Sequence, residues 1–360
     1  MAGEVVATDS EQDSKQVDQS LRTVLVAFLA NLLIAIAKSV AAGITSSASM
    51  LAEAAHSWAD AGNEIFLVIA ERRSDRGRDS GHPMGFGREA YVWSMFAAFG
   101  LFTAGAVVSI WHGIQQLIDP EEASNYLVAY IVLAISFVLE GVSFIQAMTQ
   151  ARRLAAERRR SVPDLVLNTS NPTLRAVFFE DAAALVGITI ATAAVALHQV
   201  TGSPTPDAIG SILVGVLLGV VAVVLIDRNR RFLVGEPVRS EIRQKVLQHL
   251  LARPDIDRIT YLHLEFVGPD RLYLVASVDM AGDDVEHSLA IRLRKVERDL
   301  EEHDNIEEAV LTLATPEEES LTPDDQDTPP GDDSVRVRSD QAGPPEVAAL
   351  PPTRRLRRNG

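Results

Sequence analysis

The chain has 360 residues, of which 47% are hydrophobic and 23% are charged, and its formal net charge is −16. This mixture fits neither an ordinary globular enzyme nor a protein buried wholly in a membrane, so apolar and charged segments must be separated along the chain. The absence of cysteine excludes disulfide bonds and thiolate metal sites. Any metal ligands must therefore be His, Asp, Glu or Asn side chains.

Residues 1–20 are acidic and lack the basic start and apolar run of a secretory signal. We expect no cleaved leader and interpret this segment as a disordered, solvated tail. The sequence that follows is much more apolar.

Six stretches are long and apolar enough to cross a bilayer, which takes about 20 mostly apolar residues. They comprise residues 21–43, 48–70, 91–117, 126–147, 173–200 and 208–226. The sequence therefore predicts a membrane-embedded, all-α bundle of six helices over residues 21–232, in contact with the lipid bilayer.

Arginine is concentrated in alternate connections between these stretches. Residues 71–88 and 150–160 contain five arginines each, and residues 228–231 contain three, whereas the intervening connections contain neither Lys nor Arg. By the positive-inside rule, the arginine-rich side faces the cytoplasm. We therefore expect a multi-pass integral membrane protein with both termini in the cytoplasm, located in a bacterial inner membrane.

The last third of the chain has soluble character. Residues 233–316 predict a compact α+β domain, with helices and strands at 240–251, 259–266, 272–280, 287–302 and 309–313. Residues 317–360 are rich in Glu, Asp, Pro, Gly and Ser and contain too little apolar surface to offset chain entropy. We expect this acidic, proline-rich tail to be disordered.

Ionisable side chains are costly inside a membrane span, so each of them is a candidate functional residue. The second stretch holds Glu53, His56, Asp60 and Glu64. His56 and Asp60 are four residues apart and lie on one face of a helix, about one turn apart. Imidazole nitrogen with carboxylate oxygen suits zinc and, less selectively, cobalt, iron or manganese.

A second polar helix must complete the coordination shell, because one helix supplies only half of a tetrahedral site. The fifth stretch contains Glu180 and Asp181 in an otherwise apolar run. Adjacent helical residues point about 100° apart, so we expect only one of them to face the site. Glu140 stands alone in the fourth stretch, either as a proton carrier or as a partner for an arginine such as Arg175.

These residues also have a structural interpretation. His56 and Asp60 can form a buried ion pair that holds the bundle together. Glu53 and Glu64 can lie near the ends of the span and reach water. Asn31, in the first stretch, fits an interhelix hydrogen bond better than a metal ligand.

A longer pattern surrounds the His56–Asp60 pair, and through it the chain resembles the cation diffusion facilitator family over about residues 21–316. The family signature ends in His-x-x-x-Asp-x-x-Asn, and the match comprises Ser46, Ser49, Met50, Leu51, Glu53, Ala54, His56, Ser57, Asp60 and Asn63. Residues 82–89 and 233–236 resemble two further landmarks of the family.

The resemblance implies a transporter, not an enzyme, that exports a divalent cation, with zinc as the favoured ion, from the cytosol in exchange for protons by alternating access. The implied metal ligands are His56, Asp60 and Asp181, with Glu180 as the substitute for a missing fourth ligand. Glu140, Glu53, Asn63 and Asn31 are the implied proton-carrying or supporting residues. No cofactor beyond the transported ion and no nucleic-acid partner are expected. The soluble domain would be a ferredoxin-like unit that forms a homodimer.

The sequence departs from the family pattern at one ligand position. Members commonly carry His or Asp four residues before the Asp of the fifth span, and Val177 stands there instead. Glu180 or a water molecule would take the place of that ligand. The alternative is a regulator or partner subunit that keeps the fold without transporting. Ala276 and Thr312 replace histidines of zinc-binding members, so we expect no metal in the soluble domain.

Overall fold

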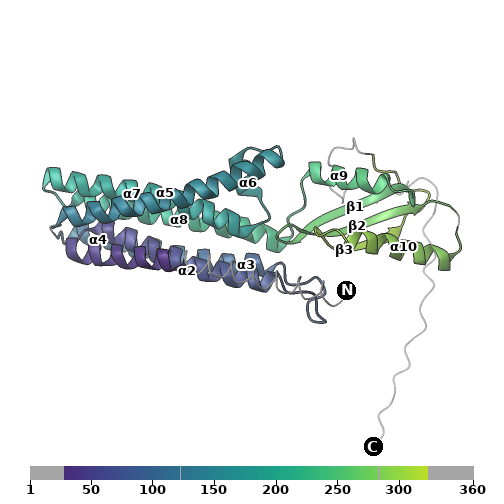
Figure 1. Cartoon of the computed structure of the whole chain (residues 1–360), viewed down its shortest axis with the longest axis horizontal. Helices are drawn as coiled ribbons and strands as arrows, with labels where there is room; N and C mark the ends of the chain where they lie inside the picture. Colours follow the sequence, from purple (N-terminus) through teal and green to yellow (C-terminus); the bar gives the residue numbers. More distant parts are fainter. Residues whose placement is uncertain (1–27, 122, 283, 323–360) are drawn as a thin grey trace, which may run out of the picture.

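A bundle of long helices and a smaller domain of helices and strands lie end to end (Figure 1). The computed structural model describes residues 28–121, 123–282 and 284–322. The predicted tail at residues 1–20 lies outside these ranges, as does most of the predicted tail at 317–360.

Short connections join the helices of the bundle. The first described helix is Phe28–Thr45. It is followed by α2 (Ala48–Ser74), α3 (Glu89–Ala97), the π-helical turn η1 (Ala98–Phe102), α4 (Thr103–Ile118), α5 (Tyr126–Glu157), the short α6 (Val162–Asn168), α7 (Pro172–Thr201) and α8 (Thr205–Val234). Because α3, η1 and α4 are continuous, they form one span.

Five helical segments of the described chain are long and apolar enough to cross a membrane. The remaining long helix, α2, has 27 residues, but its ionisable side chains make it more polar. Phe99, Ile118 and Leu127 on the outside of the bundle are 67%, 72% and 71% exposed, as expected for a surface that faces lipid. The predicted fold class, a helical membrane bundle followed by an α+β domain, is confirmed.

The α+β domain has a three-stranded sheet in the order β1-β2-β3, with β1 and β2 antiparallel and β2 and β3 parallel. Its elements are α9 (Ser240–Leu251), β1 (Ile256–Gly268), β2 (Arg271–Met280), α10 (Glu286–Glu301) and β3 (Ile306–Leu313). Alternate residues of β2 are buried, and both helices pack against them through Leu250 and Leu300. The order of these elements along the chain is that of the expected ferredoxin-like unit without its first strand in the described residues, and β3 pairs directly with β2.

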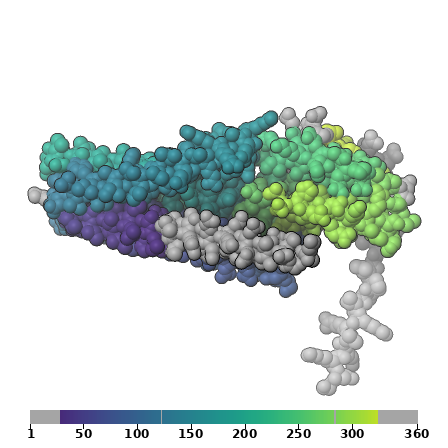
Figure 2. Space-filling view, in the orientation of Figure 1, coloured from purple at the N-terminus to yellow at the C-terminus, as the bar shows by residue number. Residues whose placement is uncertain are grey.

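Close backbone contact joins the bundle to the α+β domain. Gly87, just before α3, lies against the β1–β2 turn, and a Cβ atom on Gly87 would be 2.6 Å from the Val267 carbonyl oxygen and 2.8 Å from the Gly268 Cα. Real Cβ atoms do not approach other atoms so closely, so the contact requires glycine at position 87. Figure 2 shows the α+β domain, in green and yellow, against the end of the bundle.

Ion pairs surround this contact between the two parts. Arg88 pairs with Glu265 of β1. Glu307 of β3 binds Arg78 at 2.9 Å and Arg271 at 3.2 Å, so it links the loop before α3 to the β1–β2 turn. Exposed ion pairs each contribute only about 0–1 kcal/mol, so the close backbone fit at Gly87 is the more specific part of the joint.

Arg239, which precedes α9, provides a second link between the two parts. It donates two hydrogen bonds to the carboxylate of Asp164 on α6. These bonds hold the pKa of the Asp164 carboxyl below its usual range. The link is therefore fully formed at neutral pH and is lost only when acid protonates Asp164.

An acid from another helix caps the start of α2. The buried Asp207 of α8 accepts hydrogen bonds from the Ser47 hydroxyl at 2.9 Å, the Ala48 N–H at 2.6 Å and the Ser49 N–H at 3.3 Å. The first N–H groups of a helix have no partner within the helix, and a carboxylate there also favours the helix dipole. Asp207 thereby fixes the start of α2 relative to α8.

Replacing Asp207 with alanine should destabilise the protein by about 1–3 kcal/mol, because buried N–H groups of α2 lose their acceptor. Thermal unfolding in detergent, followed by circular dichroism, measures the change. The matched control is Asp119→Ala at an exposed position, which should leave the midpoint almost unchanged. Equal midpoints for the two variants would contradict the capping role of Asp207.

Gly87→Ala should loosen the contact between the bundle and the α+β domain, because its methyl group overlaps the β1–β2 turn. Hydrogen exchange of the backbone amides at residues 266–271 should become faster. Gly77→Ala, in the same connection, is the control because a Cβ atom there meets nothing within 4 Å. If the two variants exchange alike, the close fit at Gly87 does not stabilise the joint.

Candidate metal centre

Helices α2 and α7 lie side by side and run in opposite directions. Asn63 of α2 contacts Glu180 of α7, whereas Glu53, earlier on α2, lies against Gly187, later on α7. His56 lies between these two contacts on the same side of α2. The polar face of α2 therefore faces α7 inside the bundle.

His56 and Asp60 are both buried at this helix contact. Nε2 of His56 lies 3.2 Å from Oδ2 of Asp60. The two groups are close but not aligned for a hydrogen bond, so neither ring nitrogen has a hydrogen-bond partner in the described chain, and Oδ1 of Asp60 has none either. Buried polar atoms are normally paired. These atoms are therefore available to a cation, a proton or water.

Glu180 is the acid of α7 that lies against this pair. Its Oε2 accepts a hydrogen bond from Nδ2 of Asn63 at 2.5 Å. Its carboxyl group also interacts with that of Asp60. An imidazole and two carboxyl groups thus lie in one buried region between α2 and α7.

Asp181, the acid of α7 that the sequence favoured as a ligand, points toward α5 and not toward the His56–Asp60 pair. Its Oδ2 accepts a hydrogen bond from the Ser143 hydroxyl at 2.8 Å. Glu140 is buried one turn earlier on α5. The different directions of Glu180 and Asp181 follow from the rotation of about 100° per helical residue.

Two residues of the first helix bind acids of α2. Asn31 donates a hydrogen bond to Oε1 of Glu64 at 2.7 Å, which is the interhelix bond that the sequence favours for it. Lys38 lies 2.9 Å from Oε2 of Glu53, and both side chains are fully buried. The sequence analysis did not identify Lys38, although a lysine within the apolar stretch 21–43 was a visible signal.

Arg175 does not pair with Glu140, which was one of the two roles considered for that acid. The Arg175 guanidinium donates to the Thr169 carbonyl oxygen at 2.9 Å and to Oδ1 of Asn229 at 2.5 Å. Glu140 lies within electrostatic range of Lys38 instead. Arg175 thus connects α7 to α8, away from the His56 region.

No group of three or more His, Asp and Glu side chains in the described ranges is arranged to hold a metal ion without adjustment. Zinc binds nitrogen and oxygen at about 2.0–2.2 Å, so ligand atoms of His56, Asp60 and Glu180 would have to converge on one point. Val177, at the position where the family carries a ligand, packs against an apolar cluster that includes Leu67.

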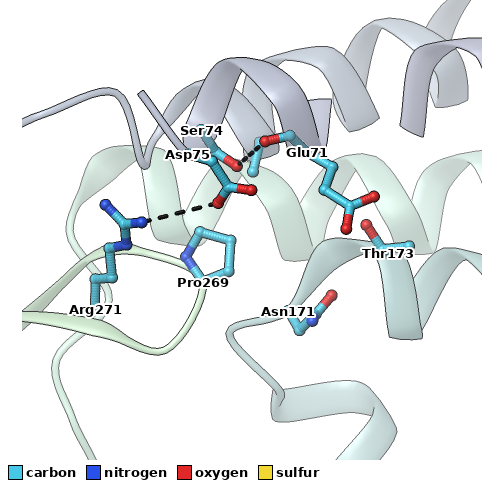
Figure 3. Close-up of a pocket in the computed structure, with 8 residues that line it drawn as sticks. Glu71, Ser74, Asp75, Asn171, Thr173, Pro269 and Arg271 are labelled. Carbon is cyan, nitrogen blue, oxygen red and sulfur yellow. Dashed lines mark hydrogen bonds and ion pairs between the residues drawn. The ribbon is translucent and has the colours of Figure 1, made fainter. Parts of the chain in front are cut away.

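A pocket of about 210 Å³ lies elsewhere, between the end of α2, the start of α7 and the β1–β2 turn. Figure 3 shows Glu71 and Thr173 facing one another across it, and Arg271 reaching toward Asp75, whose carboxylate is 3.8 Å away. This pocket belongs to the joint between the two parts of the molecule and does not contain His56.

Comparison with known proteins gives consistent matches. A family model described as the cation efflux transmembrane domain matches residues 24–234. Metal tolerance protein C4 of Arabidopsis thaliana is 35% identical over 263 residues, which cover 73% of this chain and 58% of that protein. The mitochondrial proton-coupled zinc antiporter SLC30A9 of Homo sapiens is 32% identical over 297 residues, which cover 82% of this chain and 51% of that protein.

A more distant relative is the magnetosome protein MamB of Paramagnetospirillum magneticum, 22% identical over 244 residues, which cover 68% of this chain and 77% of that protein. The chain spans about half the length of the plant and human relatives. The family model covers more than half of the chain, including all of α2 and α7. The chain therefore belongs to the cation efflux family, also called the cation diffusion facilitator family.

Proposed function

We propose that this protein transports a divalent metal cation, zinc, across the membrane. The observation that carries the proposal is the buried His56–Asp60 pair, whose ring nitrogens and Oδ1 have no hydrogen-bond partner in the described residues. One imidazole and two carboxylates give a neutral complex with a doubly charged cation. Such a complex suits the low-dielectric interior of a bundle. The names of the human and plant relatives, a zinc antiporter and a metal tolerance protein, support it.

His56, Asp60 and Glu180 are the proposed ligands. Asn63 donates a hydrogen bond to Oε2 of Glu180 at 2.5 Å, and the Glu180 carboxyl group also contacts that of Asp60, so an ion bound by both acids would replace the contact between them. Asp181 is a further ligand candidate from the same helix, although its carboxylate is bonded to Ser143.

Protons are proposed to move in the opposite direction to the metal. Imidazole and carboxylate must be deprotonated to bind zinc, so metal and protons compete for the same atoms. A more acidic compartment therefore favours release of the metal, and Glu140, buried near Lys38, is the proposed additional proton carrier. Alternating access would expose the His56 region to each side in turn.

The arginine-rich side of the bundle is proposed to face the cytosol, which places the α+β domain there. Export from the cytosol is proposed from the family, whose model is described as a cation efflux domain. A bacterial inner membrane is the proposed location. The α+β domain is proposed to hold two chains together as a homodimer, which the mass of the protein in detergent tests.

Asp60→Asn should abolish zinc flux, because the substitution keeps the shape of the side chain and removes its charge. The measurement is zinc uptake into proteoliposomes under an imposed pH gradient. Glu157→Gln, a similar change at an exposed ion pair, should transport like the wild type. Wild-type flux in Asp60→Asn would exclude the proposed site. If the zinc flux does not depend on the pH gradient, proton exchange is excluded, but zinc transport is not.

A comparison of the two adjacent acids tests the geometry of the site. Glu180→Gln should reduce zinc flux by at least about 10-fold, because Glu180 contacts Asp60 and Asn63 directly. Asp181→Asn should have the smaller effect, because Asp181 is bonded to α5. The opposite order would assign Asp181, and not Glu180, as the ligand.

A further inference from the structure

Lys38 and Glu53 form an ion pair deep inside the bundle. Their Nζ and Oε2 atoms are 2.9 Å apart, and each side chain is 0% exposed. Among the described residues, Lys38 and Arg175 are the only buried Lys or Arg side chains, and Lys38 is the one within electrostatic range of Glu53, Asp60 and Glu140. A lysine ammonium therefore lies within the same acidic region as the proposed metal ligands.

Glu53 is placed where it could itself bind a metal. It precedes His56 by three residues on α2, a spacing that brings side chains to the same face about 5–6 Å apart. Its second oxygen, Oε1, is buried and has no hydrogen-bond partner in the described chain. Gly187 of α7 makes room for this oxygen, since a Cβ atom at position 187 would overlap it.

The ammonium of Lys38 changes what Glu53 can do. A buried carboxylate without a counter-ion costs several kcal/mol, so a nearby divalent cation would attract it strongly. Lys38 neutralises Glu53, occupies one of its oxygens and repels a second cation. Zinc prefers four ligands that include nitrogen, whereas manganese prefers six oxygen ligands, so a withheld carboxylate favours zinc.

We propose that Lys38 is a positioning residue that keeps Glu53 out of the metal-ligand set and thereby favours zinc over manganese. This inference rests on the proposed function of the His56 site. It assigns to the Lys38–Glu53 pair a role in selectivity in addition to the packing of the first helix against α2.

The test is equilibrium binding of zinc alone and of manganese alone to the purified full-length protein. Lys38→Met keeps the length of the side chain and removes its charge, so it should raise the affinity for manganese relative to zinc by roughly 10-fold. The double variant Lys38→Met/Glu53→Gln should return the ratio to the wild-type value, because no carboxylate remains. Lys38→Arg, which keeps the charge, should retain the wild-type ratio.

A merely structural ion pair would weaken the binding of both metals alike and leave their ratio unchanged. An unchanged ratio in Lys38→Met, or the same shift in the double variant, overturns the inference. If Lys38→Met does not fold, Lys38→Gln, which removes the charge and keeps a polar side chain, takes its place and should raise the affinity for manganese relative to zinc. Glu53→Gln in the wild-type background should leave the ratio of zinc to manganese affinity unchanged. An unchanged ratio in Lys38→Gln also overturns the inference.

His56→Ala separates this inference from the function on which it rests. If His56→Ala loses the binding of both metals and Lys38→Met leaves the ratio of zinc to manganese affinity unchanged, the proposed metal site stands and only the role of Lys38 is contradicted. Wild-type binding in His56→Ala contradicts the proposed metal site itself.

Discussion

The cost of burying charge constrains the whole interior of this bundle. Carboxyl groups of Glu53, Asp60, Glu140, Glu180 and Asp181 are buried within helices whose outer surface is apolar. Each must have a partner or give up its charge. Lysine, asparagine and serine side chains from neighbouring helices provide partners for some of these carboxyl groups. Oδ1 of Asp60 and both ring nitrogens of His56 have no partner in the described residues.

The helix that carries His56, Glu53 and Asp60 has contacts with other elements at both ends. Asp207 caps the start of α2, and Asp75 at its other end lies near Arg271 of the β1–β2 turn. The same turn packs closely on Gly87. A movement of the α+β domain would therefore act on the end of α2, the helix that presents His56. This continuity of contacts is a physical route by which the two parts of the molecule can influence each other.

The sequence predicted the elements well because their signals are local. The helix at 240–251 has the predicted bounds, and the strands at 259–266 and 272–280 extend by at most three residues. The pairing of buried groups was less predictable, since it depends on packing between distant segments. Lys38 binds an acid 15 residues away on another helix, and Asp207 binds groups about 160 residues away. Which of Glu180 and Asp181 faces α2 likewise depends on the rotation of α7, which spacing alone does not determine.

The hydrogen bond between Asn63 and Glu180 shows how the site can be both preorganised and adaptable. A carboxylate has two oxygens, and Asn63 occupies Oε2 of Glu180. In the proposed site, the Glu180 carboxyl group would exchange its contact with Asp60 for the ion while Asn63 still holds Oε2, so the contact between α2 and α7 would be kept. His56 needs no such exchange, because its nitrogens have no bond to break. A site with few bonds to break can bind and release its ion rapidly, which is what transport requires.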